Sequence, residues 1–98
     1  MNTNEFLQKN PCTVAFHVRP EAKLSNGMTM SIQASDFHYC SPRVNNAEDY
    51  TSVEVGYPSE SLPSQFDQYR DGDDSPVWAY VPVDLLDEFI QENGGFAD

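Results

Sequence analysis

The feature that most constrains the fold is a strand that runs directly into a helix near the end of the sequence. Residues 77–81, with the sequence VWAYV, form a short run of β-branched and aromatic side chains, which is typical of a buried strand. Pro82 ends the strand ladder because it has no amide hydrogen, and it fits the first turn of a helix, where Asp84 adds favourable negative charge. Four large apolar residues then share one helical face: Leu85, Leu86, Phe89 and Ile90. Asn93 and Gly94 end this helix, which we expect to pack on one face of its own sheet.

Three earlier segments predict further strands. Residues 12–18 alternate apolar and polar side chains, residues 27–35 do so most regularly, and residues 50–57 carry valines at alternate positions. The Asn-Gly pair at residues 26–27 indicates a hairpin turn. We therefore expect the first two strands to pair antiparallel, with the polar residues 19–25 as part of their connection.

Two short helical segments complete the prediction. Residues 3–8 form one helical turn with Thr3 as its N-cap, and residues 63–70 form a short helix anchored by Phe66. A chain of 98 residues has the length of one domain. We therefore predict a single α+β domain over residues 1–98. It has a small antiparallel sheet of about four strands, with the C-terminal helix packed on one face and a short N-terminal helical turn.

Charge is distributed unevenly along the sequence. Residues 1–43 hold four basic and three acidic residues, a net charge of +1, whereas residues 44–98 hold Arg70 and 13 acidic residues, a net charge of −12. A negative surface repels phosphates and anionic lipids, so we expect no direct binding to nucleic acid or to a membrane. No apolar run has the length of a membrane span, and residues 2–10 are too polar for a signal peptide. We therefore expect a cytoplasmic protein, in the host cell cytoplasm if a phage encodes it.

Seven of the 13 acidic residues of the second half form two groups. One group shares a face of the C-terminal helix, at spacings i, i+3, i+4 and i+8: Asp84, Asp87, Glu88 and Glu92. The other group comes just before the last strand: Asp71, Asp73 and Asp74. On a solvated surface such charges keep a small protein soluble. Carboxylates on a rigid element also offer Arg side chains paired contacts with fast, salt-sensitive association. These seven residues are therefore our candidate binding site for a basic protein that itself binds DNA or RNA.

Cysteine and histidine residues raise the question of a metal or thiol site in the first half of the sequence. Four such residues offer zinc ligands, or a thiol with its base: Cys12, His17, His38 and Cys40. Their spacing matches no zinc or cysteine-enzyme motif. The Asp-Gly-Asp sequence within residues 67–75 lacks the ligand spacing of an EF-hand and indicates a turn. We therefore expect no metal, no cofactor and no enzymatic activity.

Residues 36–42 form a polar-aromatic segment that we interpret as a packed turn. In this interpretation Phe37 and Tyr39 are buried, and His38 bonds to the backbone. A disulfide between the only two cysteines remains an open alternative, although nothing else in the sequence indicates a secreted disulfide scaffold.

The strand at residues 77–81 is apolar on both faces, so its aromatic side chains need cover. Burial under the terminal segment, for example by Phe96, is one solution. The other solution places Trp78 and Tyr80 at a surface that meets a partner, because these residue types are favoured at interfaces. A structural, homo-oligomeric phage protein that dimerises through this sheet face is therefore the main alternative to the acidic binding surface.

In size, acidity and lack of catalytic motifs the chain resembles the small inhibitors that phages and mobile elements carry against host defence. Anti-CRISPR proteins are the largest such class, and acidic immunity proteins and antitoxins for basic nucleases are similar in the same respects. Three segments also resemble short phage reading frames: QASDFHYCSPR, VEVGYPSE and YVPVDLLDEFIQENGG. The resemblance implies an inhibitor, such as an anti-CRISPR protein or a nucleic-acid mimic, that blocks a basic nucleic-acid-handling protein. An immunity protein or antitoxin is the further alternative, and no residue role is transferred.

Overall fold

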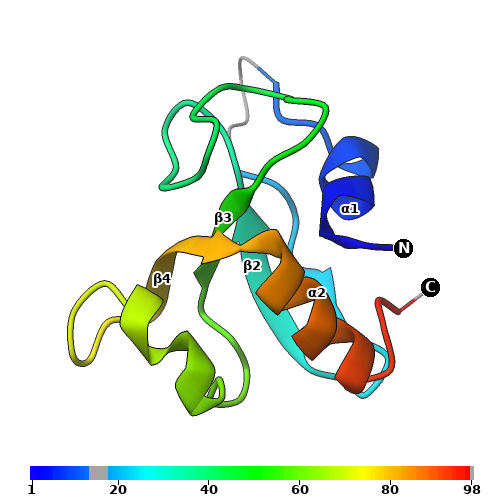
Figure 1. Cartoon of the computed structure of the whole chain (residues 1–98). Helices are drawn as coiled ribbons and strands as arrows, with labels where there is room; N and C mark the ends of the chain where they lie inside the picture. The colour runs from blue at the N-terminus through cyan, green and yellow to red at the C-terminus, as the bar shows by residue number, and fades with distance from the viewer. Residues whose placement is uncertain (14–17, 98) are drawn as a thin grey trace.

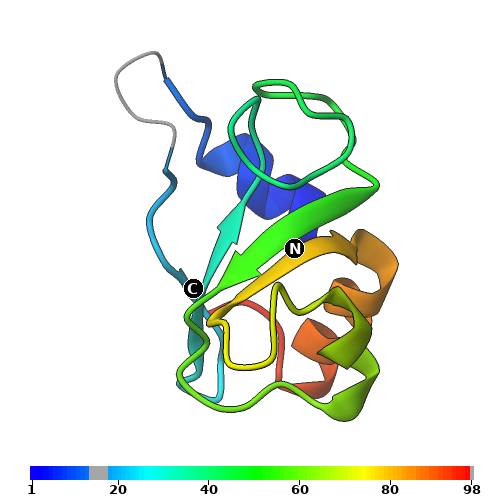
Figure 2. The same cartoon turned by 90° about the vertical axis from the view of Figure 1, so that its left-hand side faces the viewer.

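An antiparallel sheet of four strands with helices on one side forms the fold (Figure 1, and turned by 90° in Figure 2). The computed structural model describes residues 1–13 and 18–97. In chain order the elements are α1 (Thr3–Lys9), β1 (Ala22–Lys23), β2 (Thr29–Gln33), β3 (Ser52–Gly56), the 3₁₀ helix η1 (Ser64–Tyr69), β4 (Val77–Pro82) and α2 (Val83–Glu92). The strands follow the order β1-β2-β3-β4, and each neighbouring pair is antiparallel. The predicted small α+β fold, with its C-terminal helix and short N-terminal helix, is confirmed.

Strand β4 passes into α2 without a loop. Pro82 is the register partner of Ser52 in the sheet and is also the N-cap residue of α2, with φ −57° and ψ 133°. The amide of Val83 donates to the backbone oxygen of Thr51 at 3.0 Å, which ties the first turn of the helix to β3. The chain therefore turns at Pro82, and α2 is directed back over the sheet.

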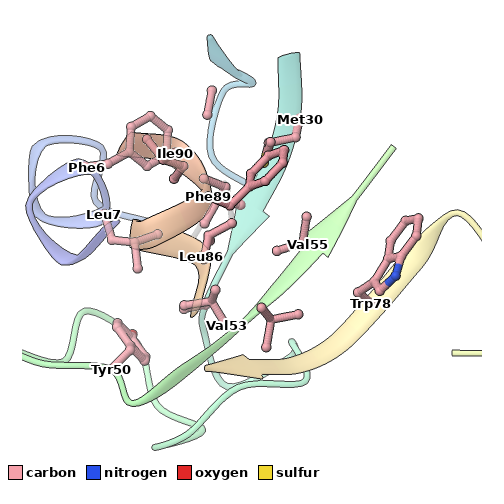
Figure 3. Packing of buried hydrophobic residues seen from close by; sticks show 14 of the residues in the cluster. Phe6, Leu7, Met30, Tyr50, Val53, Val55, Trp78, Leu86, Phe89 and Ile90 are labelled. Carbon is pink, nitrogen blue, oxygen red and sulfur yellow. The ribbon is translucent and has the colours of Figure 1, made fainter. Parts of the chain in front are cut away.

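The core lies between α2 and the sheet. Leu86, Phe89 and Ile90 of α2 are at most 7% exposed. The strands contribute buried aliphatic side chains to the same cluster: Met30, Ile32, Val53, Val55 and Val81. Figure 3 shows this contact, with α1 on the other side of α2. Phe66 of η1 extends it, because its ring meets Phe89 edge-on at 5.5 Å. Burial of each such side chain contributes about 1.5–3 kcal/mol to folding.

The hairpin of β1 and β2 is built on the predicted Asn-Gly turn. Gly27 has φ 93°, which glycine adopts without strain, and its amide donates to Leu24 at 2.9 Å. The strand that pairs with β2 across this turn is β1, however, and not residues 12–18. β1 places one exposed residue between the buried Ala22 and Leu24, an alternation too short to indicate a strand in the sequence. Most of the strand predicted at residues 12–18 lies outside the described residues.

A bulge interrupts β4 opposite β3. Val53 pairs with Val81 but Val55 pairs with Trp78, so β4 has one extra residue in this interval. Tyr80 takes up the difference with φ 53°, a left-handed conformation that is uncommon outside glycine. Trp78 and Val81 therefore both point into the core. Trp78 is 6% exposed and Tyr80 is 45% exposed, so the expectation that these two aromatic residues share a sheet face is wrong.

Both edges of the sheet are paired with neighbouring segments of the chain. Outside β4, Arg70 forms a bridge with Trp78, and the amide of Asp71 donates to Val77 at 2.9 Å. Outside β1, Phe96 forms a bridge with Leu24. Unpaired strand edges promote association between chains, so this pairing removes part of the surface on which a second sheet can add.

The N-terminal helix α1 begins with a capping box. The Asn2 side chain accepts a hydrogen bond from the Glu5 amide, and the Glu5 side chain accepts one from the Asn2 amide. The N-cap is therefore Asn2 and not Thr3, which is buried against α2 instead. Phe6 stacks on Phe96, with 5.1 Å between ring centroids and 4° between ring planes. Phe96 thus covers α1 and not the aromatic residues of β4.

Replacement of Leu86 by alanine tests the contact between α2 and the sheet. Because Leu86 is fully buried, Leu86→Ala should lower the free energy of unfolding by about 2–5 kcal/mol. The matched control Leu85→Ala removes a half-buried leucine from the same helix and should cost less. Urea denaturation measures both variants. If both variants lost the same unfolding free energy, α2 would not pack on the sheet through the face that carries Leu86.

Candidate functional site

Three carboxylates of α2 form a row on its solvent side. Asp84, Glu88 and Glu92 follow one another at four-residue intervals and all three are exposed, whereas Leu86 and Ile90 point inward. We call these three residues the acidic stripe. Within the described residues, no Lys or Arg nitrogen lies within 4.0 Å of their carboxylates. The stripe is therefore a row of charges that the described part of the chain does not neutralise.

Asp87, which we predicted as part of the same site, has an intramolecular role. Its Oδ1 atom accepts a hydrogen bond from the Thr3 amide at 2.7 Å and another from the Thr3 hydroxyl at 2.5 Å. Thr3 is the first residue of α1, where backbone amides lack partners within the helix. Asp87 thus joins the start of α1 to α2, at the boundary between the buried and exposed sides of α2.

The second acidic group lies in the turn between η1 and β4. Asp71, Asp73 and Asp74 are all exposed, and we call them the acidic loop. Gly72 has φ 101°, and its backbone oxygen accepts from the Ser75 amide at 3.2 Å, which closes the turn. The acidic loop is therefore held on a hydrogen-bonded turn.

η1 links the acidic loop to the acidic stripe. Phe66 of η1 packs on Phe89 of α2, so both helical elements cover the same face of the sheet. In Figure 1, η1 lies between the loop that precedes β4 and helix α2. The structure thus carries the two acidic groups on adjoining elements, with the exposed Asp67 of η1 between them.

Arg70 is the basic residue nearest in sequence to the acidic loop, and its contacts are with other groups. Its guanidinium lies over the ring of Trp78, 5.0 Å from the ring centroid, and its Nε donates to the backbone oxygen of Ser75 at 2.8 Å. This position covers the buried indole and holds the turn before β4. It does not bring the guanidinium to within 4.0 Å of an aspartate in the described structure.

A second exposed feature, which sequence reasoning found only in part, is a cluster of Tyr39, Arg43 and Tyr80. The two tyrosine rings lie 5.9 Å apart, and the Arg43 guanidinium is 5.4 Å from the Tyr39 ring centroid. The amide of Tyr80 donates to the backbone oxygen of Tyr39 at 3.1 Å, so the bulge in β4 and the preceding loop hold each other. Tyr39 is 42% exposed, so the prediction that it is buried is wrong.

The turn at residues 36–42 packs through small side chains instead of its aromatic ones. Cys40 and Ser35 are buried, whereas Phe37 is 65% exposed. The Cys40 thiol donates to the backbone oxygen of Ser35 at 3.2 Å. His38 places its Nδ1 atom 2.6 Å from the Ser35 hydroxyl, and its amide donates to the Ser35 backbone oxygen at 3.4 Å. The buried part of this turn is therefore formed by small side chains, and its two large aromatic rings are exposed.

Neither cysteine has the environment of a reactive thiol. Both are free, and burial raises the pKa of the Cys40 thiol above its usual value. Cys12 is buried and contacts the Asn46 side chain. In the described residues, no three His, Cys, Asp or Glu side chains come together as metal ligands. His17, one of the four candidate zinc ligands, lies outside these residues.

Alanine substitutions separate the structural role of Asp87 from the exposed position of Asp84. Asp87→Ala removes the acceptor of two hydrogen bonds at the start of α1 and should cost about 1.5–3 kcal/mol of unfolding free energy. Asp84→Ala changes an exposed residue in the first turn of the same helix, removes its favourable interaction with the helix dipole and should cost only about 0.3–1 kcal/mol. Urea denaturation compares the two variants. If Asp87→Ala is as stable as Asp84→Ala, Asp87 does not join the two helices.

Comparison with family models, with curated proteins and with solved structures finds no match to this chain. Among the described residues, no helix has the length and apolar character needed to cross a membrane. A function for this chain is therefore inferred from its own charges and contacts.

Proposed function

We propose that this protein is an acidic inhibitor that binds a basic nucleic-acid-handling protein through the acidic stripe, with the acidic loop as an added contact. The observation that carries the proposal is the row of exposed carboxylates at Asp84, Glu88 and Glu92, which no described Lys or Arg side chain pairs. Nothing in the described core requires this row, because the buried side of α2 is formed by other residues.

The spacing of the stripe suits a surface that normally receives phosphates. Successive stripe residues are four positions apart, so they rise about 6 Å along the helix axis. Phosphates along one strand of duplex DNA rise about 3.4 Å per nucleotide and also wind around the axis, so neighbouring phosphates are separated by a similar distance of several ångströms. Arginine side chains in a nucleic-acid groove can therefore meet the stripe in paired, charge-assisted hydrogen bonds.

Rigid presentation favours such binding, because little conformational entropy is lost when the partner is met. α2 is fixed by Leu86, Phe89 and Ile90 on the sheet and by the bonds of Asp87 to α1. The formal net charge of −11 also attracts a basic partner over distances of about a Debye length, ~8 Å at physiological salt. Direct binding to DNA or RNA is opposed by the same charge.

The exposed cluster of Tyr39, Arg43 and Tyr80 supports a second candidate function, a homo-oligomeric protein. Tyrosine and arginine are enriched among residues that dominate protein interfaces. The dimer surface predicted from the sequence included Trp78, which is buried in this fold, so the cluster replaces it in this candidate. Analytical ultracentrifugation separates the two functions. A monomer agrees with the acidic inhibitor, whereas a dimer that persists at high salt and is lost in Tyr80→Ser favours the homo-oligomer.

Charge reversal of the stripe tests the proposed function. The immobilised parent should capture a partner from a bacterial lysate at about 0.1 M NaCl. The triple variant Asp84→Lys, Glu88→Lys, Glu92→Lys should not capture it. The parent should release that partner at about 1 M NaCl, where the Debye length falls to ~3 Å. Mass spectrometry identifies the captured protein, and circular dichroism confirms the fold.

The control variant reverses three exposed carboxylates elsewhere: Glu21→Lys, Asp36→Lys, Glu48→Lys. Each triple variant replaces three negative charges by three positive ones, so both change the net charge from −11 to −5. The control should keep most of the capture. Equal capture by the two triple variants, or capture that resists 1 M salt, would count against binding through the stripe.

A further inference from the structure

Arg19 is a buried cation, which is unusual in a chain of this size. Its side chain is 4% exposed. A guanidinium keeps its positive charge in a protein, and burial of a charge is costly unless an opposite charge or a full set of hydrogen bonds compensates it. The surroundings of Arg19 therefore need an explanation.

The described partners of this guanidinium are all neutral oxygens. Nη1 donates to the backbone oxygen of Ala34 at 2.5 Å, and Nε donates to that of Leu7 at 3.4 Å. Nη2 donates to the Asn46 side chain at 3.4 Å. No described carboxylate lies within 4.0 Å, and these bonds use three of the five N–H groups that an arginine carries. The buried charge thus has spare donors and no described counter-ion.

A cavity of about 190 Å³ adjoins Arg19. Its described walls come from α1, the segment after it and the loop before β3: Leu7, Gln8, Pro11, Arg19, Asn46, Ala47 and Tyr50. For comparison, a cavity of about 150 Å³ in another protein accepts benzene, which has six non-hydrogen atoms. The space beside Arg19 therefore suits a molecule of about that size.

The other polar groups of these walls already have partners. The Tyr50 hydroxyl donates to Val44 at 2.6 Å and accepts from the Ala47 amide at 3.1 Å. The Asn46 amide group donates to the backbone oxygen of Cys12 at 2.9 Å, and that of Gln8 donates to Glu48 at 2.8 Å. Among the described walls, Arg19 is thus the charged donor, and the apolar side chains of Leu7, Pro11 and Ala47 lie beside it.

We propose that this cavity binds a small organic monocarboxylate. The carboxylate accepts hydrogen bonds from the Arg19 guanidinium, whose planar fork matches it, and a short apolar tail lies against Leu7, Pro11 and Ala47. Arg19 is the one cation among the described walls, and the protein has a net charge of −11, which favours a singly charged ligand over a phosphate dianion. The site uses a different surface from the acidic stripe and does not depend on the proposed function.

Butyrate, which has six non-hydrogen atoms, is the probe for this site. This chain is titrated with butyrate while NMR monitors the Arg19 Nε–H and the Ala47 amide. The Kd for butyrate should be about 1 mM. Butyramide has the same shape without the charge and should bind at least tenfold more weakly, as should inorganic phosphate. Equal binding of butyramide, tighter binding of phosphate, or no response to about 50 mM butyrate would overturn the proposal.

Two variants locate the binding. Ala47→Leu fills the cavity and leaves Arg19 in place, so butyrate affinity should fall at least tenfold. Ala97→Leu enlarges a half-buried alanine away from the cavity and should leave the affinity unchanged. Arg19→Gln should abolish binding in a protein whose NMR spectrum remains that of a folded chain. If Arg19→Gln does not fold, Ala47→Leu decides, and unchanged affinity in Ala47→Leu would contradict the site.

Discussion

The direct junction between β4 and α2 is the constraint on which the rest of the structure depends. Because no loop separates them, Pro82 sets both the position of the helix and its rotation about its axis. Leu86, Phe89 and Ile90 are then directed onto β2 and β3, and η1 and α1 pack against the same helix. A domain of this size has a stability of roughly 5–15 kcal/mol, so a helix that buries three large side chains provides a substantial part of it.

The charge of the surface follows from the same junction. Once the apolar side of α2 faces the sheet, Asp84, Glu88 and Glu92 can only face solvent. The three arginines do not compensate them, because Arg19 is buried and Arg43 and Arg70 stack on aromatic rings. Concentrated like charge disfavours the compact state, and binding of the proposed basic partner would offset this cost.

The parts of the fold that the sequence predicts well are those with strong local patterns. The apolar run of β4, the Pro82 boundary, the helical spacing of α2 and the Asn-Gly turn each have one physical interpretation, and the structure confirms them. The bulge at Tyr80 has no such local sign. It shows only in the pairing of β4 with β3, and it decides that Trp78 is buried while Tyr80 is exposed.

The same limit applies to the candidate sites. Spacing places Asp87 beside Asp84 and Glu88, but its bond to Thr3 depends on the packing of α1 against α2, which joins residues 84 positions apart. Arg19 lies in a polar segment that the sequence indicates as an exposed loop, and its burial depends on helix α1 and on the segments that hold Ala34 and Asn46. A local pattern cannot show such contacts, because no neighbour in sequence takes part in them.

Competition between this protein and nucleic acid for the captured partner tests the central claim most directly. Fluorescence anisotropy of a labelled DNA or RNA measures the apparent Kd between the partner and the nucleic acid, at rising concentrations of this protein. If the acidic stripe occupies the nucleic-acid surface, the apparent Kd increases linearly with the concentration of this protein, and the labelled strand is fully released at saturation. A ternary complex, in which the partner holds this protein and its nucleic acid together with unchanged affinity, would contradict the account.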